Sequence, residues 1–269
     1  MRIEEIYIQN FKGIEKKNFS FNPTFNVAIG NNATGKSTLL HSIQVALGGY
    51  LQSLDIPASA NYRRQFREGE VFVKWNDVGK GYVKNTEPTL IITKAKFSHQ
   101  DTGTHWKRVM LRNNTTSHNQ KDAGELIQTI ADLLNKMPNQ LIPIVASFGT
   151  ERTVAQIRKG KKAQSKRTKM AKGFLAALSE KVDFNGVLEW LHNYDTELLY
   201  QKEFIGTREA VYNAIHTAIP YLRKIEYNRY NLEFEAEVTI DKHTIGKTLH
   251  SNMSDGLKAM LNLEYVLDL

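Results

Sequence analysis

The N-terminal part of the chain changes from strand-like to helix-like hydrophobic spacing. Residues 3–8 and 18–22 alternate apolar with polar side chains, which predicts two strands with one buried face each. The apolar run at 25–29 predicts a third, short strand that is buried. From Lys36 onward the apolar residues recur at helical intervals, and a pair of glycines at Gly48 is expected to end this helix.

Similar patterns continue to the end of the chain, with no internal repeat and no linker between domains. Further strands are predicted at 71–75, 89–97, 106–111, 141–153 and 231–240. Further helices are predicted at 121–136, 173–194, 208–225 and 253–269. The three tryptophans, Trp75, Trp106 and Trp190, are expected to pack in cores.

Between the predicted buried strand and the first helix lies the segment GNNATGKST, with the spacing G-x-x-x-x-G-K-S of a phosphate-binding loop. The candidate nucleotide-binding residues are Gly30, Asn31, Asn32, Ala33, Thr34, Gly35, Lys36, Ser37 and Thr38. A chance Gly- and Asn-rich turn before a helix is the alternative, and the flanking strand and helix favour the phosphate loop.

The residue types of this loop suit a nucleoside triphosphate with Mg²⁺. Gly30 and Gly35 let backbone N–H groups approach the phosphates, and the helix that follows presents the positive end of its dipole. Lys36 is expected to reach the β- and γ-phosphates, and the Ser37 hydroxyl is expected to be a ligand of Mg²⁺. The sequence therefore predicts ATP and Mg²⁺ as cofactors.

With this loop preceded by strand-like sequence, the chain resembles the ATPase heads of the SMC, RecF and ABC type, through the turn QNFKGI (9–14) and the segment FNVAIGNNATGKSTLL (25–40). The resemblance implies an α/β P-loop NTPase with an N-terminal antiparallel β-rich layer, a parallel core sheet and a helical subdomain. One head domain is then expected over 1–269, with a nucleotide-binding lobe at 1–150, a helical, basic insert at 151–230 and a strand with a helix at 231–269.

The segment SNMSDGLKAML (251–261) resembles the signature motif of these ATPases. In the family this motif meets the γ-phosphate bound by the other protomer, so that ATP lies between two heads. The resemblance implies a role for Ser254 and Gly256 in nucleotide binding, with Lys36 and Ser254 as catalytic residues, in a head-to-head homodimer or higher oligomer. A plain helix N-cap is the alternative interpretation of the same residues.

The family's Mg²⁺-binding Asp and catalytic Glu follow the signature helix, and the sequence ends before a strand that would carry them. Asp268 lies only 14 residues after Ser254 and is followed by Leu269, so it is not expected to be a metal ligand. We therefore expect a chain that lacks its C-terminal part, with weak hydrolysis by these residues alone. A non-hydrolysing ATP-binding scaffold or regulatory subunit, completed by another chain, is the alternative function.

The more specific resemblance is to bacterial SMC-like AAA-type ATPases, including those of antiphage systems such as retron and Septu modules. It implies that ATP-dependent pairing of heads regulates DNA processing or a partner effector nuclease, with antiphage defence as the implied setting. In similar heads, basic residues that come with this turn approach the nucleotide, which implies the same role for Lys12 of QNFKGI. An ordinary surface lysine is the equally weighted alternative.

The formal net charge of +8 is concentrated in one basic tract between 158 and 172. Its members are Arg158, Lys159, Lys161, Lys162, Lys166, Arg167, Lys169 and Lys172. Such a tract is a candidate surface for DNA or RNA, and a solvated loop is the equally weighted alternative. The absence of cysteines, of a signal peptide and of a long apolar segment predicts a cytoplasmic protein with no membrane association.

Overall fold

The computed structural model describes the N-terminal part of the chain almost continuously and the C-terminal part in short pieces. The described residues are 1–56, 63–84, 87–97, 103–110, 120–136, 142–149, 174, 177–178, 213, 215–217, 219–228, 230, 233–239, 245–249 and 252–253. The chain divides into two compact units, Met1–Val145 and Ala146–Leu269, and each is treated by itself below.

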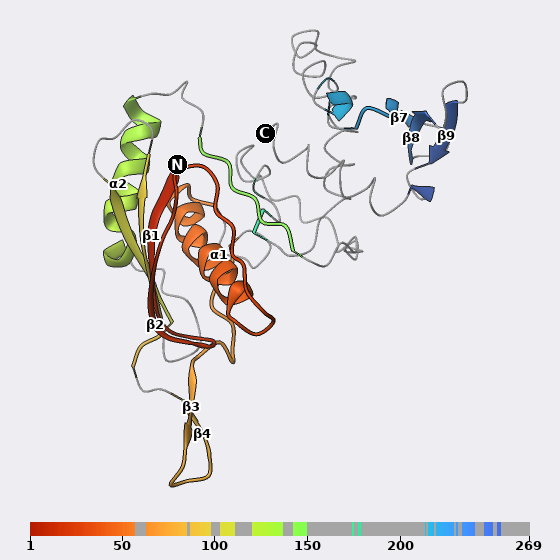
Figure 1. Cartoon of the computed structure of the whole chain (residues 1–269). Helices are drawn as coiled ribbons and strands as arrows, with labels where there is room; N and C mark the ends of the chain where they lie inside the picture. Colours follow the sequence, from red (N-terminus) through yellow and green to blue (C-terminus); the bar gives the residue numbers. More distant parts are fainter. Residues whose placement is uncertain are drawn as a thin grey trace. The chain divides into compact units, whose positions relative to one another are not determined.

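The first unit is built on an antiparallel four-stranded sheet in the order β2-β1-β5-β6 (Figure 1). Its strands are β1 (Arg2–Phe11), β2 (Ile14–Ser20), β5 (Leu90–Lys96) and β6 (Thr104–Val109). The alternation in the sequence determines which face is buried, because Ile6 and Ile8 of β1 are fully buried and Ile8 lies opposite Ile91 of β5. The predicted strands at 3–8, 18–22, 89–97 and 106–111 are thus confirmed as to type.

Two helices pack on this unit: α1 (Lys36–Ser53) and α2 (Gln120–Lys136). Helix α1 contacts β1, β5 and β6, and its Val45 and Ala46 are in the hydrophobic cluster that includes Ile6 and Ile8. Helix α2 lies along the edge strand β6 and buries Leu126, Ile130 and Leu133 on one stripe, as the 3.6-residue period predicts. The predicted helix at 121–136 is confirmed.

The expectation that Gly48-Gly49 ends the first helix is wrong, because α1 continues through both glycines to Ser53. Tertiary packing explains why glycine is present there. A Cβ at Gly48 would lie 2.5 Å from the backbone oxygen of Arg64, and a Cβ at Gly49 would lie 2.9 Å from the Trp106 ring. The helix therefore approaches its neighbours more closely than any side chain would allow.

Replacing Gly48 with alanine is expected to destabilise the protein by about 1–3 kcal/mol, because backbone is the obstacle and it has little freedom to move. Gly124 of α2 is the matched control, since it is exposed and has nothing within 4 Å of an added Cβ. Gly124→Ala should instead stabilise by about 1 kcal/mol through helix propensity. Urea unfolding of both variants measures the difference; equal effects would contradict the packing explanation.

The predicted buried strand at 25–29 is also wrong. This segment is described without a strand, and Phe25, Val27 and Ile29 are 75%, 62% and 90% exposed. A strand of the kind buried between others needs hydrogen-bonding neighbours on its edges, and no described residue pairs with this segment. The described strands pair only in antiparallel fashion, so they do not include the expected parallel core sheet.

The predicted strand at 141–153 is likewise wrong within its described part. Residues 142–149 form no strand, although Val145 is buried. Tyr50 of α1 donates a hydrogen bond from its hydroxyl to the Pro143 carbonyl, at 2.7 Å. The part of this segment that belongs to the first unit, 142–145, therefore packs beside the helix rather than adding to the sheet.

A separate two-stranded hairpin, β3 (Val73–Asn76) with β4 (Gly81–Lys84), extends away from the four-stranded sheet (Figure 1). It confirms strand structure within the predicted segment 71–75. The expectation that Trp75 packs in a core is wrong, since its side chain is 50% exposed, whereas Trp106 is buried as expected. Trp190 lies outside the described residues.

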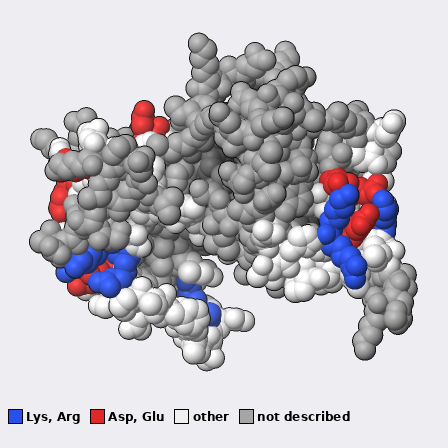
Figure 2. Space-filling model, turned by 90° about the horizontal axis from the view of Figure 1, so that it is seen from above, with Lys and Arg blue, Asp and Glu red and all other residues white. Residues whose placement is uncertain are grey.

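The second unit contains an antiparallel sheet of β7 (Leu222–Asn228), β8 (Glu233–Thr239) and β9 (Ile245–Leu249). The predicted strand at 231–240 is confirmed as β8. The helix predicted at 208–225 is wrong over its last residues, because Leu222 and Ile225 are buried in β7, with Ile225 opposite Ala236. Lys247 of this sheet forms ion pairs with Glu235 and Glu237, and Figure 2 shows basic and acidic side chains next to one another there.

Candidate nucleotide site

The glycine loop forms a compact turn immediately before α1. Gly35 is the N-cap residue of α1 with φ +91°, and Ala33 has φ +65°. Left-handed residues such as those on either side of Thr34 occur in anion-binding nests, in which successive N–H groups point into one concavity. The loop is exposed from Gly30 to Thr34, so this backbone is accessible to a ligand.

The Lys36 side chain folds back across the loop. Its ammonium group donates hydrogen bonds to the backbone oxygens of Gly30, at 2.7 Å, and Asn31, at 2.6 Å. The Thr34 hydroxyl donates to the same Asn31 oxygen at 2.8 Å. A Cβ at Gly30 would lie 2.7 Å from this hydroxyl, so a small residue at position 30 preserves the arrangement. The positive charge is thereby held at the loop.

The start of α1 fits an anion. Its N-cap makes no side-chain hydrogen bond and its first turn contains no acidic residue, so the first backbone N–H groups are without intrahelical or capping acceptors. These donors, the helix dipole and the Lys36 ammonium all favour negative charge at the same place. The chemistry of a polyphosphate therefore fits the residues present.

Ser37 is the described residue suited to a metal bound with such a polyphosphate. It is exposed in the first turn of α1 and carries a hydroxyl oxygen. The described residues contain no group of three His, Asp or Glu side chains that could hold a metal ion. Mg²⁺ at this loop would take most of its oxygen ligands from phosphates and water, as Mg²⁺ does in many nucleotide sites.

Gly35→Ala is expected to destabilise the protein by about 1–2 kcal/mol, because φ +91° is unfavourable for a residue with a Cβ. Gly13 is the control, since an added Cβ there has nothing within 4 Å and the backbone does not have a positive φ. Gly13→Ala should change the free energy of unfolding by less than about 0.5 kcal/mol. Thermal or urea unfolding separates the two cases, and equal losses would mean that the loop does not require a left-handed residue at position 35.

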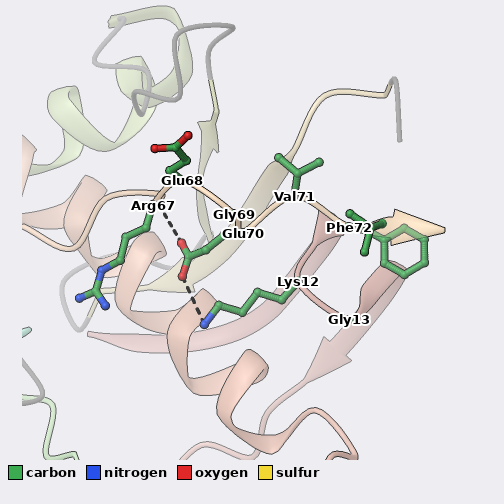
Figure 3. A pocket seen from close by; sticks show the side chains of 9 residues that line it. Lys12, Gly13, Arg67, Glu68, Gly69, Glu70, Val71 and Phe72 are labelled. Atoms are coloured by element: carbon green, nitrogen blue, oxygen red, sulfur yellow. Dashed lines mark hydrogen bonds and ion pairs between the residues drawn. The ribbon is translucent and has the colours of Figure 1, made fainter. Parts of the chain in front are cut away.

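Lys12 lies beside α1 within a cluster of charged side chains (Figure 3). Its ammonium group contacts Nδ1 of His41, four residues after Ser37 on α1, and forms an ion pair with Glu70 at 3.2 Å. The backbone N–H of Lys12 also donates to the Glu70 carbonyl at 2.7 Å. Lys12 has φ +50° in the tight turn between β1 and β2, where glycine is usual. These contacts hold Lys12 in an unfavourable backbone conformation close to the start of α1.

Glu70 is the centre of this cluster, which sequence reasoning did not identify. It is buried and forms a two-point ion pair with the equally buried Arg64, whose guanidinium Nη2 lies 2.5 Å from Glu70 Oε1. Burial alone would raise the pKa of Glu70, but the hydrogen bonds from Arg64 and from the Arg67 backbone, with the charges of Arg64 and Lys12, lower it overall. The signal available in the sequence was the density of charge in YRRQFREGE (62–70).

A hollow of about 600 Å³ opens beside this cluster (Figure 3). It is lined by Lys12, Gly13, Arg67, Glu68, Gly69, Glu70, Val71, Phe72 and Val73. No residue of the glycine loop lines this hollow. Lys12 links the hollow to α1, because its side chain lines the hollow together with Val73 of β3 and also contacts His41 of α1.

The remaining predicted site residues lie outside the described residues. These are Ser254 and Gly256 of the signature-like motif, and the basic tract of Arg158, Lys159, Lys161, Lys162, Lys166, Arg167, Lys169 and Lys172. Their roles stay predictions, and Asp268, which is not expected to be a ligand, also lies outside the described residues. Among the described helices, none is both long and apolar enough to cross a membrane.

The loop, the uncapped helix start and the folded-back lysine are the features expected of a nucleotide-binding protein of the P-loop class. Residues 5–249 match the family described as an AAA domain. Because the match spans most of the chain, the protein belongs to this AAA domain family, and the expected SMC/RecF type of AAA ATPase is confirmed.

Among curated proteins, the chain is similar to the DNA replication and repair protein RecF of Alkaliphilus oremlandii (strain OhILAs), with 41% identity over 49 residues. The matched segment is 18% of this chain and 13% of that relative's length. The chain thus aligns with a small part of this relative, and the likeness concerns that part.

Proposed function

We propose that the protein binds ATP with Mg²⁺ at the glycine loop and acts as an SMC/RecF-type ATPase in DNA processing. The observation that carries this proposal is the Lys36 ammonium held at 2.7 and 2.6 Å from the Gly30 and Asn31 oxygens, directly at an uncapped helix start. An incoming phosphate offers the ammonium a charged acceptor in place of two neutral ones, which is the stronger type of hydrogen bond.

Each loop residue has a role in this proposal. The backbone from Asn31 to Gly35 surrounds the β-phosphate, Lys36 binds the β- and γ-phosphates, and Ser37, next to Thr38, supplies an oxygen to Mg²⁺. When bound, Mg²⁺ neutralises charge on the phosphates. Lys12 is held next to α1 by Glu70 and adds positive charge near this end of the helix.

Pairing of two heads is the second part of the proposal. Ser254 and Gly256 of one protomer are proposed to complete the site of another, so that ATP promotes a head-to-head homodimer or higher oligomer. The relative is a DNA replication and repair protein by name, which supports DNA processing as the general process. Regulation of an effector nuclease in antiphage defence is the more specific form of this proposal and rests on the resemblance alone.

Ser254→Glu tests the pairing. Its negative charge and bulk are expected to repel the partner's γ-phosphate, while the glycine loop of each protomer still binds ATP. Light scattering after size-exclusion chromatography, with ATP or a slowly hydrolysed analogue, measures the mass of the assembly. Wild-type protein should gain mass with nucleotide and the variant should not. Pairing that persists in the variant, or that requires no nucleotide, would contradict the role of the signature-like motif.

Turnover distinguishes the two candidate functions. Phosphate release by wild-type protein above the level of Lys36→Ala, with or without DNA, supports an ATPase. ATP binding without any turnover supports the non-hydrolysing subunit instead, whose general base comes from another polypeptide.

A further inference from the structure

The β3–β4 hairpin presents large side chains to solvent. Trp75 and Tyr82 lie opposite one another in the strand register and their rings meet edge to face, with centroids 5.2 Å apart. Trp75 is 50% and Tyr82 is 73% exposed. A two-stranded hairpin that nothing covers is marginally stable in water and has no core of its own. Neighbouring aromatic rings exposed on such a hairpin are therefore better explained by binding of a ligand than by packing in a core.

The register places these rings together with further groups on one face. In an antiparallel pair, opposed residues share a face and every second residue returns to it, so Val73, Trp75, Tyr82 and Lys84 share one face of the hairpin. We name this set the aromatic face. Within the described residues, the hairpin strands pair only with each other, and no third strand or helix covers this face.

The charge of the hairpin indicates the chemistry of its ligand. Residues 73–84 contain Lys74, Lys80 and Lys84 but a single acidic residue, Asp77. The Asp77 carboxylate accepts a hydrogen bond from the Trp75 indole at 2.8 Å, which fixes one edge of that ring. Lys74 has a partner, Glu15, at 3.7 Å, whereas Lys80 and Lys84 form no ion pair with any described residue. The surface therefore combines open aromatic rings with unpaired positive charge.

We propose that the aromatic face binds single-stranded nucleic acid, with bases stacking on Trp75 and Tyr82 and with Lys80 and Lys84 contacting phosphates. Stacking platforms beside lysines are the means by which proteins hold single strands without reading sequence. A duplex hides its base faces in its own stack, so it offers this surface much less. A purely apolar protein partner would leave Lys84, on the same face, without an acceptor.

The aromatic face would be a second binding surface, separate from the proposed ATP site. The choice of nucleic acid as its ligand rests in part on the proposed role in DNA processing. Binding at the hairpin is independent of the nucleotide at α1. The basic tract at 158–172 is a separate candidate, so the experiment has to locate the contact as well as measure affinity.

Fluorescence anisotropy of the full chain with a labelled oligothymidylate measures the affinity. The double variant Trp75→Ala with Tyr82→Ala should bind on the order of 10- to 100-fold more weakly. Trp75→Phe, which keeps a ring, should retain most of the affinity. Lys84→Gln should lower the slope of log K against log salt by about 0.7, as expected for one lost phosphate contact on a single strand.

Val78→Ser is the matched control, because Val78 is 97% exposed at the tip of the same hairpin and is not on the aromatic face. It should bind as the wild type does. Unchanged melting temperatures in all variants are expected, since these side chains are outside the core, and they exclude misfolding as the cause. ATP affinity of the same variants, measured by calorimetry, should be unaltered, which separates this inference from the proposed function.

Photo-crosslinking with 5-iodouracil in the oligonucleotide locates the contact. The expected crosslink is to Trp75 or Tyr82. Crosslinks confined to 158–172, undiminished binding by the double alanine variant, or tighter binding of the matching duplex would each overturn the proposal.

Discussion

Lys36→Ala is expected to weaken ATP binding by about 10- to 150-fold, because it removes charge-assisted hydrogen bonds worth roughly 1.5–3 kcal/mol. In the structure the same ammonium donates to the oxygens of Gly30 and Asn31, and on binding a phosphate it exchanges these neutral acceptors for charged ones. Isothermal titration calorimetry with Mg²⁺ and ATP measures the loss.

Lys17→Ala is the control for loss of charge alone. Lys17 is an exposed lysine of β2 whose ammonium lies 5.1 Å from the centre of the Phe19 ring. Its removal should leave ATP affinity unchanged within error. The nucleotide site would have to be placed elsewhere if Lys36→Ala bound ATP as tightly as the wild type and Lys17→Ala.

Glu70→Gln is expected to lower the free energy of unfolding by about 3–5 kcal/mol, the range for breaking a buried ion pair by removing one partner. The substitution keeps the shape of the side chain but leaves the buried Arg64 guanidinium without a compensating charge. It also removes the charge that faces Lys12 at 3.2 Å. Urea unfolding followed by circular dichroism measures the change.

Glu87→Gln provides the contrast, because its ion pair with Lys16 at 2.9 Å is about half exposed on both sides. Exposed pairs of this kind contribute about 0–1 kcal/mol. Similar losses in the free energy of unfolding for the two variants would mean that burial does not make the Glu70–Arg64 pair contribute more than an exposed pair.

The same carboxylate predicts a dependence of stability on pH. The pKa of Glu70 in the folded protein lies below its ordinary value of 4.5, so its contribution is present above that value and is lost as pH falls through the lowered pKa. Stability of the wild type should therefore decline on acidification in this range. Glu70→Gln should show a shallower decline, and parallel curves would count against this assignment.

Local signals in the sequence were sufficient for the glycine loop and for most elements around it. The spacing of Gly30, Gly35 and Lys36 located the loop, and α1 begins at Lys36 as predicted. The alternation at 89–97 and the helical stripe at 121–136 predicted β5 and α2, because each element buries the apolar residues of one face. In these elements the hydrophobic period and the tertiary environment agree.

The errors occurred where a residue's environment depends on distant parts of the chain. Gly48-Gly49 resembled a helix end, yet the glycines are present because Arg64 and Trp106 lie against them. The apolar segment 25–29 and Trp75 suggested burial, but no described neighbour covers them. The Glu70 cluster joins Lys12, His41 and Arg64 from three separate segments, and no local pattern reveals such a meeting.

Helix α1 combines a secured end with an open one. Its C-terminal half packs tightly at Gly48, against the Arg64 backbone, and at Gly49, against the Trp106 ring. Its start has no side-chain cap. A capping side chain at position 35 would be strained at φ +91°, and its oxygen would occupy the N–H groups that an anion needs. Packing at the far end thus lets this helix leave its first N–H donors uncapped, and a side-chain cap engineered there would compete directly with the ligand.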